Sequence, residues 1–202
     1  MIIQNNAYIR KGGADLKRKI ALLVLFVFLL PALSSCAPKG DPVEHFQFTD
    51  QNGKFFSLSD LKGKVWVADF IFTSCKTVCP PMTMHMSELQ EKIKKAGYKD
   101  VELVSFSIDP EVDTPQKLKQ FANQFNSDFS MWHFLTGYSQ KKIEKFAMKN
   151  FKNPVAKSDG NDQVVHGTSF YVVNKNGELI KDFDGSADFD ADKIMKEIER
   201  LR

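Results

Sequence analysis

This sequence has a small net charge, no internal repeat and three cysteines. Residues 1–36 carry five of the 28 basic and one of the 25 acidic side chains, so the remaining 23 basic and 24 acidic side chains give a net charge of −1. With no basic excess, and no basic run interleaved with aromatic residues, the composition excludes nucleic-acid binding. Without a repeat, the chain beyond residue 36 is expected to form one domain of ordinary size, with a core rich in its 18 phenylalanines.

The first 36 residues have the pattern of an export signal. Basic side chains at positions 10–19 precede an apolar run at 20–33, which is followed by Ser34, Ser35 and Cys36. This end resembles a bacterial lipobox, in which the cysteine carries the lipid of the mature protein. We therefore expect residues 1–36 to be a signal peptide with lipobox, residues 37–42 a linker and residues 43–202 the domain. The protein is then exported and lipid-anchored through Cys36 at the outer face of the cytoplasmic membrane. An uncleaved anchor, or an ordinary signal with a stray cysteine, is the alternative, and either also places the domain outside the cytoplasm.

The other two cysteines, Cys75 and Cys79, follow a hydrophobic stretch at 65–72 that is rich in aromatic and β-branched residues. Such a stretch is typical of a strand buried on both faces of a sheet. Because proline suits the first turn of a helix, a helix is predicted to start at Pro80 with Cys79 at its cap. The positive end of a helix favours thiolate over thiol, which makes a sulfur a better nucleophile or metal ligand. Both uses remain open, as does a plain stabilising disulfide or a pair of inert buried thiols.

The remaining pattern predicts alternating strands and helices. Hairpin signals stand at Asn52-Gly53 and Asn176-Gly177. Strands are expected at 101–108 and 131–135. Helices are expected to follow Asp113 or Thr114, to open at Ser139 and to begin at Asp188, whereas residues 150–167 show no clear period. The resulting order β-α-β-α-β-α-β-β-α, with the cysteines after the first core strand, resembles the thioredoxin fold. The fold class expected is α/β, thioredoxin-like, with an added N-terminal β-hairpin.

Three motifs together resemble the Sco/SenC family over residues 43–201. They are Cys-x-x-x-Cys-Pro at 75–80, the stretch Ile-Asp-Pro-Glu-Val-Asp-Thr-Pro at 108–115, and a late His166 ahead of an aromatic strand. The resemblance implies a membrane-anchored, copper-binding factor that assembles the binuclear copper (CuA) centre of cytochrome c oxidase. It also implies Cys75, Cys79 and His166 as ligands of one copper, as Cu(I) or Cu(II), and Asp109 in an acidic loop near the site. The family often has a basic residue in the second motif, where this chain has Glu111-Val112.

The donor set suits copper on chemical grounds as well. Two thiolates are soft ligands for Cu(I), and an added imidazole suits Cu(II). Three protein ligands leave a position open, through which a partner's ligand can enter before the first ligands leave. Thioethers also bind Cu(I), but Met82 and Met86 fall on the apolar stripe of a helix, which favours core packing for the cluster around Met84 and His85. His45 and His133 lie in strand-like stretches and are expected to pack or face solvent.

Two main functions are compatible with these residues. The first is a copper metallochaperone whose partner is the oxidase subunit that carries the CuA centre, supported by an exported thiol reductant because the dithiol must be reduced to bind. The second is a thiol–disulfide oxidoreductase that reduces the cysteines of the same subunit, with Cys75 and Cys79 forming the redox disulfide. A thiol peroxidase is disfavoured because no upstream proline shapes a peroxidatic site. Beyond these cysteines no catalytic residue is assigned.

Overall fold

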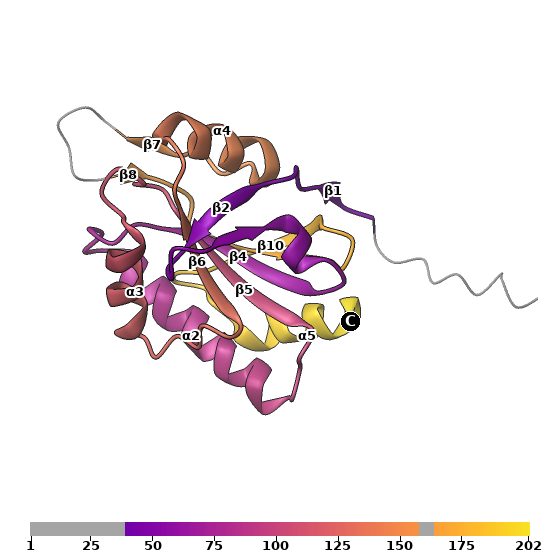
Figure 1. The fold of residues 1–202 in the computed structure, drawn as a ribbon. Helices are drawn as coiled ribbons and strands as arrows, with labels where there is room; N and C mark the ends of the chain where they lie inside the picture. Colours follow the sequence, from indigo (N-terminus) through magenta and orange to yellow (C-terminus); the bar gives the residue numbers. More distant parts are fainter. Residues whose placement is uncertain (1–38, 158–163) are drawn as a thin grey trace, which may run out of the picture. The chain divides into compact units, whose positions relative to one another are not determined.

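The computed structural model describes residues 39–157 and 164–202, in which eight strands form one sheet of order β1-β10-β9-β4-β5-β6-β2-β3 (Figure 1). The strands of this sheet are β1 (Asp41–Pro42), β2 (Gln47–Asp50), β3 (Phe55–Ser57), β4 (Val65–Ile71), β5 (Val101–Ser107), β6 (Trp132–Thr136), β9 (Ser169–Val173) and β10 (Glu178–Asp184). A separate pair, β7 (Ala156–Lys157) and β8 (Val164–Val165), completes the strands of these residues. This mixed sheet, with the cysteines directly after a central strand, is the expected thioredoxin-like α/β fold.

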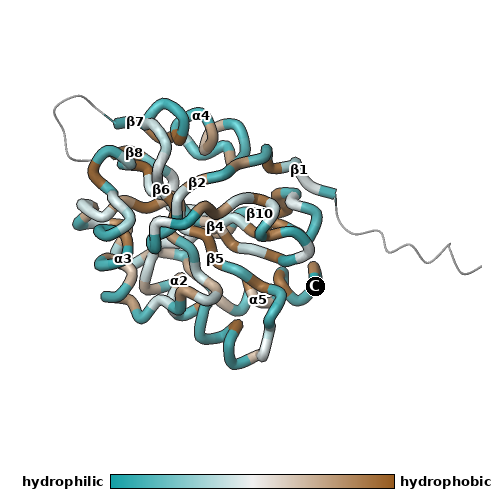
Figure 2. Tube along the Cα trace, in the orientation of Figure 1, coloured by the Kyte–Doolittle hydropathy of each residue, from teal (hydrophilic) through white to brown (hydrophobic). Residues whose placement is uncertain are grey.

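Helices cover the sheet on both sides. They are the 3₁₀ helix η2 (Leu58–Leu61) and the α-helices α2 (Cys79–Lys95), α3 (Pro115–Asn123), α4 (Gln140–Phe151) and α5 (Ala191–Leu201). Figure 1 shows α4 on one side of the sheet and α2 with α5 on the other. In Figure 2 the hydrophobic colour follows the central strands β4 and β5, whereas hydrophilic and hydrophobic colours alternate along the helices. The aromatic core predicted from composition lies between these layers.

The parallel strands β4 and β5 form the centre that positions the site. Every residue of both strands is buried, as expected for strands covered on both faces. Their register pairs Val65 with Val101 and Ile71 with Ser107, so the two strands end at the same edge of the sheet. The loop that follows β4 and carries Cys75 therefore lies beside the turn that follows β5.

The two predicted hairpins are present. β2 pairs with β3 through Phe48 and Phe56, and Gly53 in the connecting turn has φ of 75°, a left-handed conformation that glycine adopts without strain. β2 also pairs with β6, which attaches this N-terminal hairpin to the edge of the sheet. The second hairpin joins β9 and β10 around Gly177, which also has a positive φ.

Several predicted boundaries were displaced. Helix α2 starts at Cys79 and not at Pro80, with Val78 in helical conformation as the N-cap, because Pro80 fits inside the first turn where no N–H partner is needed. Helix α5 starts at Ala191, after Asp190 and not at Asp188, because the Asp190 carboxylate accepts hydrogen bonds from the N–H groups of Asp192 and Lys193.

Three short strands have no counterpart in the sequence prediction. β1 pairs with β10 through Asp41 and Leu179, so the chain joins the sheet within the stretch assigned to the linker. β7 and β8 pair within the stretch that showed no period. The predicted signal peptide and Cys36 lie outside the described residues. None of the helices within residues 39–157 and 164–202 combines the length and the apolar composition of a membrane span.

Candidate functional site

Cys75 and Cys79 lie on either side of the start of α2. Cys75 belongs to the loop between β4 and α2, and Cys79 is the first residue of the helix. The backbone N–H of Cys79 donates a hydrogen bond to the Cys75 Sγ at 3.3 Å. Neither cysteine forms a disulfide, and both are buried: the exposed fraction is 5% for Cys75 and 0% for Cys79. The helix start thus presents an N–H group to one sulfur, as the sequence analysis expected.

The two sulfurs differ in charge. The hydrogen bond that the Cys79 thiol donates to the Cys75 sulfur lowers the pKa of Cys75 to about 3, against the opposing effect of burial. The pKa of Cys79 is raised instead, because its thiol serves Cys75 as a hydrogen-bond donor and lies buried. At neutral pH the pair therefore consists of one thiolate and one thiol, so only Cys75 is ready to act as a nucleophile or ligand.

His166 reaches these sulfurs from the other end of the chain. It follows β8, and its Nε2 lies 3.7 Å from the Cys79 Sγ, 87 residues away in sequence. Its Nδ1 lies 2.8 Å from the Gly167 carbonyl oxygen. Because a carbonyl only accepts, Nδ1 carries the proton and the Nε2 of a neutral ring directs its lone pair towards the sulfur. The imidazole is therefore oriented to accept the Cys79 proton or to bind a metal ion.

The spacing of these donors is compatible with a shared ion. For metal–ligand bonds of about 2.1 to 2.3 Å and near-tetrahedral angles, two ligand atoms lie roughly 3.6 Å apart. The separation of 3.7 Å between Cys79 Sγ and His166 Nε2 matches that value. As the side chains are placed, however, no group of three or more His, Cys, Asp or Glu residues in the described part of the chain is arranged to hold a metal ion.

A buried carboxylate that the sequence analysis did not select lies beneath the site. Asp69 in β4 is fully buried, and neither of its carboxylate oxygens has a hydrogen-bond partner among the described residues. Burial raises its pKa to about 7, although nearby Ser105 and His166 oppose the rise. Its charge in turn helps to raise the pKa of Cys79. A lone acidic residue inside an apolar strand was the sequence signal for this group.

Asp113 fixes the loop that carries the cysteines. Its carboxylate accepts hydrogen bonds from the backbone N–H and the hydroxyl of Thr73, at 3.2 and 2.5 Å, and from the Ser107 hydroxyl at 2.6 Å. The residue is 1% exposed, and burial raises its pKa. Thr114, not Asp113, caps α3 by accepting a hydrogen bond from the Lys117 N–H. Asp113 is thus part of the support of the cysteine loop.

Asp109, which the family resemblance places in an acidic loop near the site, forms an ion pair with Lys157. Its carboxylate lies 2.6 Å from the Lys157 Nζ, and Glu111 lies 3.6 Å from the same nitrogen. In the described residues Asp109 has no hydrogen bond or ion pair with Cys75, Cys79 or His166. Any influence of Asp109 on the site is therefore transmitted through Lys157 or through the turn after β5.

Most of the other candidate ligands make packing contacts away from the cysteines. Met82 and Met86 are fully buried in the core, and Met84 is exposed. The His85 Nδ1 contacts the Gly185 carbonyl oxygen at 2.9 Å, and the ring stacks on Phe189. His133 stacks on Phe56 and lies 3.1 Å from the Glu102 carboxylate. These contacts agree with the packing roles that the sequence analysis favoured.

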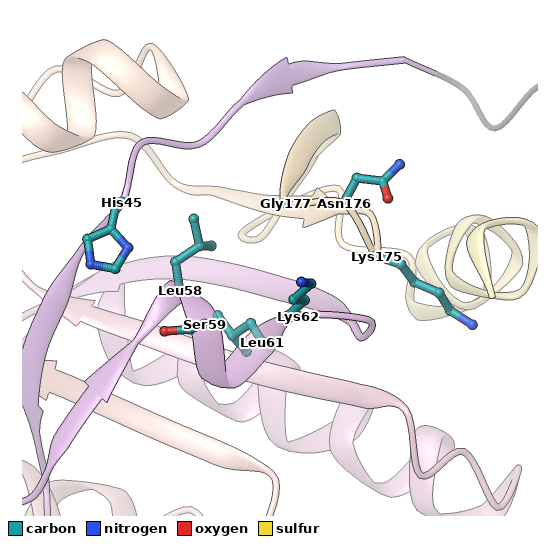
Figure 3. A pocket seen from close by; sticks show the side chains of 8 residues that line it. All are labelled: His45, Leu58, Ser59, Leu61, Lys62, Lys175, Asn176 and Gly177. Atoms are coloured by element: carbon teal, nitrogen blue, oxygen red, sulfur yellow. The ribbon is translucent and has the colours of Figure 1, made fainter.

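A pocket of ≈ 350 Å³ lies away from the cysteines (Figure 3). Its lining includes His45, Leu58, Lys62, Lys175 and Asn176. Lys62 precedes the first residue of β4, whereas Cys75 follows the last, so the pocket and the thiols belong to opposite ends of that strand. The side chains in Figure 3 include no thiol. The pocket is therefore separate from the candidate site.

Comparisons with known proteins agree on one family. The SCO1/SenC family model matches residues 36–202. The SCO1 protein homolog of Bacillus subtilis is 47% identical over 178 residues, which cover 88% of this chain and 92% of that protein. A crystal structure of a SCO1/SenC family lipoprotein from Bacillus anthracis is 48% identical, with a TM-score of 0.77 over 83% of this chain and 98% of that one.

Two further structures concern the chemistry of relatives. BsSco, a member of the Sco family of cytochrome c oxidase assembly proteins with an identified disulfide switch, is 49% identical, with a TM-score of 0.74 over 80% of this chain and 94% of that one. ScoI of Bradyrhizobium japonicum, solved with copper bound, is 26% identical, with a TM-score of 0.66 over 80% of this chain and 99% of that one. Sequence, fold and coverage agree: the chain belongs to the SCO1/SenC family.

Proposed function

We propose that this protein is a copper metallochaperone that binds one copper through Cys75, Cys79 and His166 and delivers it to the CuA-bearing subunit of cytochrome c oxidase. The observation that carries the proposal is the 3.7 Å approach of the His166 Nε2 to the Cys79 Sγ, beside the low-pKa sulfur of Cys75. Copper-bound and oxidase-assembly relatives support the choice of metal and partner. Copper is the cargo in this role.

Each proposed ligand has a distinct part in binding. The Cys75 thiolate is the first ligand because it is already charged at neutral pH. Cys79 must release its proton before its sulfur can bind, and the His166 Nε2 and the Asp69 carboxylate are the groups near enough to influence that step. The imidazole adds a nitrogen donor that favours Cu(II), whereas the two thiolates alone suit Cu(I). Three ligands leave a position at which a partner's ligand can begin the transfer.

A copper titration of the reduced full-length chain in mild detergent, compared with His166→Ala, tests the ligand set. We expect a one-to-one Cu(II) complex with thiolate-to-copper charge transfer and a matching electron paramagnetic resonance signal, both lost in the variant. His85→Ala is the matched control because that imidazole is engaged with Gly185. The ligand set is wrong if two Cu(II) ions are simply reduced to Cu(I) for each Cys75–Cys79 disulfide formed, with release of the one proton of the Cys79 thiol and no effect of His166.

A thiol–disulfide oxidoreductase is the second candidate, favoured by the unequal pKa values of the two thiols. The Cys75 thiolate would attack a disulfide of the oxidase subunit, forming a mixed disulfide and releasing one partner thiolate. Deprotonated Cys79 would then attack the Cys75 Sγ, forming the Cys75–Cys79 disulfide and releasing the second partner thiolate. Two electrons pass from the cysteine pair to the partner. An exported thiol reductant then supplies two electrons that reduce the Cys75–Cys79 disulfide. Cys79→Ser should trap the mixed disulfide, and its absence on non-reducing gels would exclude this reaction.

The proposed location is the outer face of the cytoplasmic membrane, with the lipid on Cys36. The order of basic, apolar and small residues before Cys36 supports export, and the similar Bacillus anthracis protein is a lipoprotein. Cys36→Ser should abolish incorporation of a labelled fatty acid and move the protein from the membrane fraction to the medium. Unchanged labelling of the variant would contradict lipidation at this residue.

A further inference from the structure

The strand pair β7–β8, which directly precedes His166, is held together by few contacts between its own two strands. β7 and β8 are joined by two residue pairs, Ala156 with Val165 and Lys157 with Val164. A pair this short is marginal in water without further contacts, and one such contact is the burial of Val164, 6% exposed, in the core. His166 comes directly after β8, so any displacement of this pair moves the imidazole relative to the cysteines. The position of His166 therefore depends on what fastens β7 and β8 to the domain.

Lys157 provides such an attachment. Its Nζ lies 2.6 Å from the Asp109 Oδ1, and the two side chains are 21% and 2% exposed. Asp109 is itself held firmly, because its carbonyl oxygen accepts hydrogen bonds from the N–H groups of Val112 and Asp113, and its N–H donates to the Ser107 hydroxyl. A sheltered, charge-assisted hydrogen bond of this length is among the stronger polar contacts in proteins.

The turn at residues 109–113 is thereby connected to both parts of the site. Through Asp109 it holds Lys157 and the β7–β8 pair, and through Asp113 it holds Thr73 in the cysteine loop. On the far side of His166, the Gly167 N–H donates to the Asn153 Oδ1 at 2.7 Å. A Cβ at Gly167 would lie 2.9 Å from that oxygen, so the backbone there has little room to shift.

We propose that Lys157, through its ion pair with Asp109, is a positioning residue that holds His166 over the cysteines and so strengthens Cu(II) binding at the site. The proposal rests on the function proposed above and adds a residue outside the ligand set. Because Cu(I) can be held by the two thiolates alone, whereas Cu(II) needs the imidazole, loss of the ion pair weakens Cu(II) binding selectively.

The test compares Lys157→Met and Asp109→Asn with wild type, His166→Ala and the control Lys149→Met, all as full-length chains in detergent. Lys149 forms an ion pair of similar length with Glu44 but on the exposed surface, with 70% of its side chain exposed. Cu(II) affinity is measured by competition with a Cu(II) chelator and Cu(I) affinity by competition with a Cu(I) chelator under reducing conditions. Hydrogen–deuterium exchange of the metal-free protein, read out in peptides that cover residues 164–168, reports how well β8 is held in place without copper.

We expect Lys157→Met and Asp109→Asn each to weaken Cu(II) binding about 10- to 100-fold, the usual effect of losing a partner that orients a ligand. We expect Cu(I) affinity to change less than about threefold, exchange at residues 164–168 to rise, and Lys149→Met to match wild type. The double variant Lys157→Met/Asp109→Asn should be no worse than either single variant, because both remove the same contact.

Three results would overturn the positioning role. They are unchanged Cu(II) affinity in Lys157→Met, equal losses for both copper states, or unchanged exchange at residues 164–168. If wild type itself binds no Cu(II) through His166, the proposed function fails. Exchange in the metal-free protein then still decides whether the ion pair holds β8 in place.

Discussion

Asp69 lies in an environment that disfavours the charged form of its carboxyl group. Its carboxyl group has a pKa of about 7 in place of 3.8, because burial without a hydrogen-bond partner disfavours the charged form. A carboxyl whose pKa is raised by folding is tolerated while protonated and opposes folding once ionised. The stability that protonated Asp69 contributes to the folded state is therefore fully present below about pH 4 and is lost as the pH rises through 7.

The variant Asp69→Asn removes this titration. We expect the free energy of unfolding of wild type to fall by roughly 2 to 4 kcal/mol between pH 4 and pH 8 relative to that of Asp69→Asn. Urea unfolding of the reduced, copper-free chain at several pH values measures the difference. Asp60→Asn, which changes an acid of lowered pKa on the surface, is the control. Parallel pH profiles for wild type and Asp69→Asn would show that Asp69 is ionised or solvated throughout.

At the scale of an element, helix α5 shows how a local cap sets a boundary. Two acidic residues, Asp188 and Asp190, precede this helix, and only Asp190 directs its carboxylate to the free N–H groups of the first turn. The sequence contains both acids at plausible distances from the apolar positions Ile194 and Ile198. The choice between them depends on the backbone at Asp190, which is extended with φ of −138°.

Asp190→Ala should destabilise the protein by about 1 kcal/mol, because two N–H groups of α5 lose their acceptor. Asp188→Ala, which removes the acid that the sequence suggested as the start, should change stability by less than about 0.5 kcal/mol. Thermal or urea unfolding of the two variants measures both values. Equal losses in the two variants would contradict the assignment of the cap.

At the scale of the whole molecule, the N-terminal hairpin and the thioredoxin-like sheet share one core. Phe46, directly before β2, stacks on Phe48 and makes edge contacts with Trp66, Phe106 and Phe146. Those partners come from β2, β4, β5 and α4. The added hairpin is therefore an integral part of the domain.

Phe46→Ala should lower the free energy of unfolding by roughly 3 to 5 kcal/mol, the cost of emptying a well-packed aromatic site. The matched control is Phe55→Ala in the same hairpin, where the residue is 79% exposed and removal of its ring should cost less than about 0.5 kcal/mol. A single cooperative transition in both proteins is expected by circular dichroism. Loss of the hairpin in a separate, earlier transition would show that it folds as an independent unit.

The sequence by itself determined the elements with strong local signals. The apolar runs that became β4 and β5, the glycine turns at Gly53 and Gly177, and the cap Ser139 were predictable because each depends on residues close together in the chain. For α3 the sequence left Asp113 and Thr114 as alternative caps, and the structure selects Thr114. The two-residue strands were not, because β1, β7 and β8 are too short to show a period and exist only through their partners.

The tertiary structure decided how the site is assembled. The motifs that carry Cys75, Cys79 and His166 were visible in the sequence, and the family resemblance alone connected them. Only the fold brings the His166 ring to the sulfur of Cys79, since residues 87 positions apart have no local geometry in common. The partnership of Asp109 with Lys157 and the isolation of Asp69 were likewise hidden, because a carboxylate's partner or lack of one depends on which distant elements pack around it.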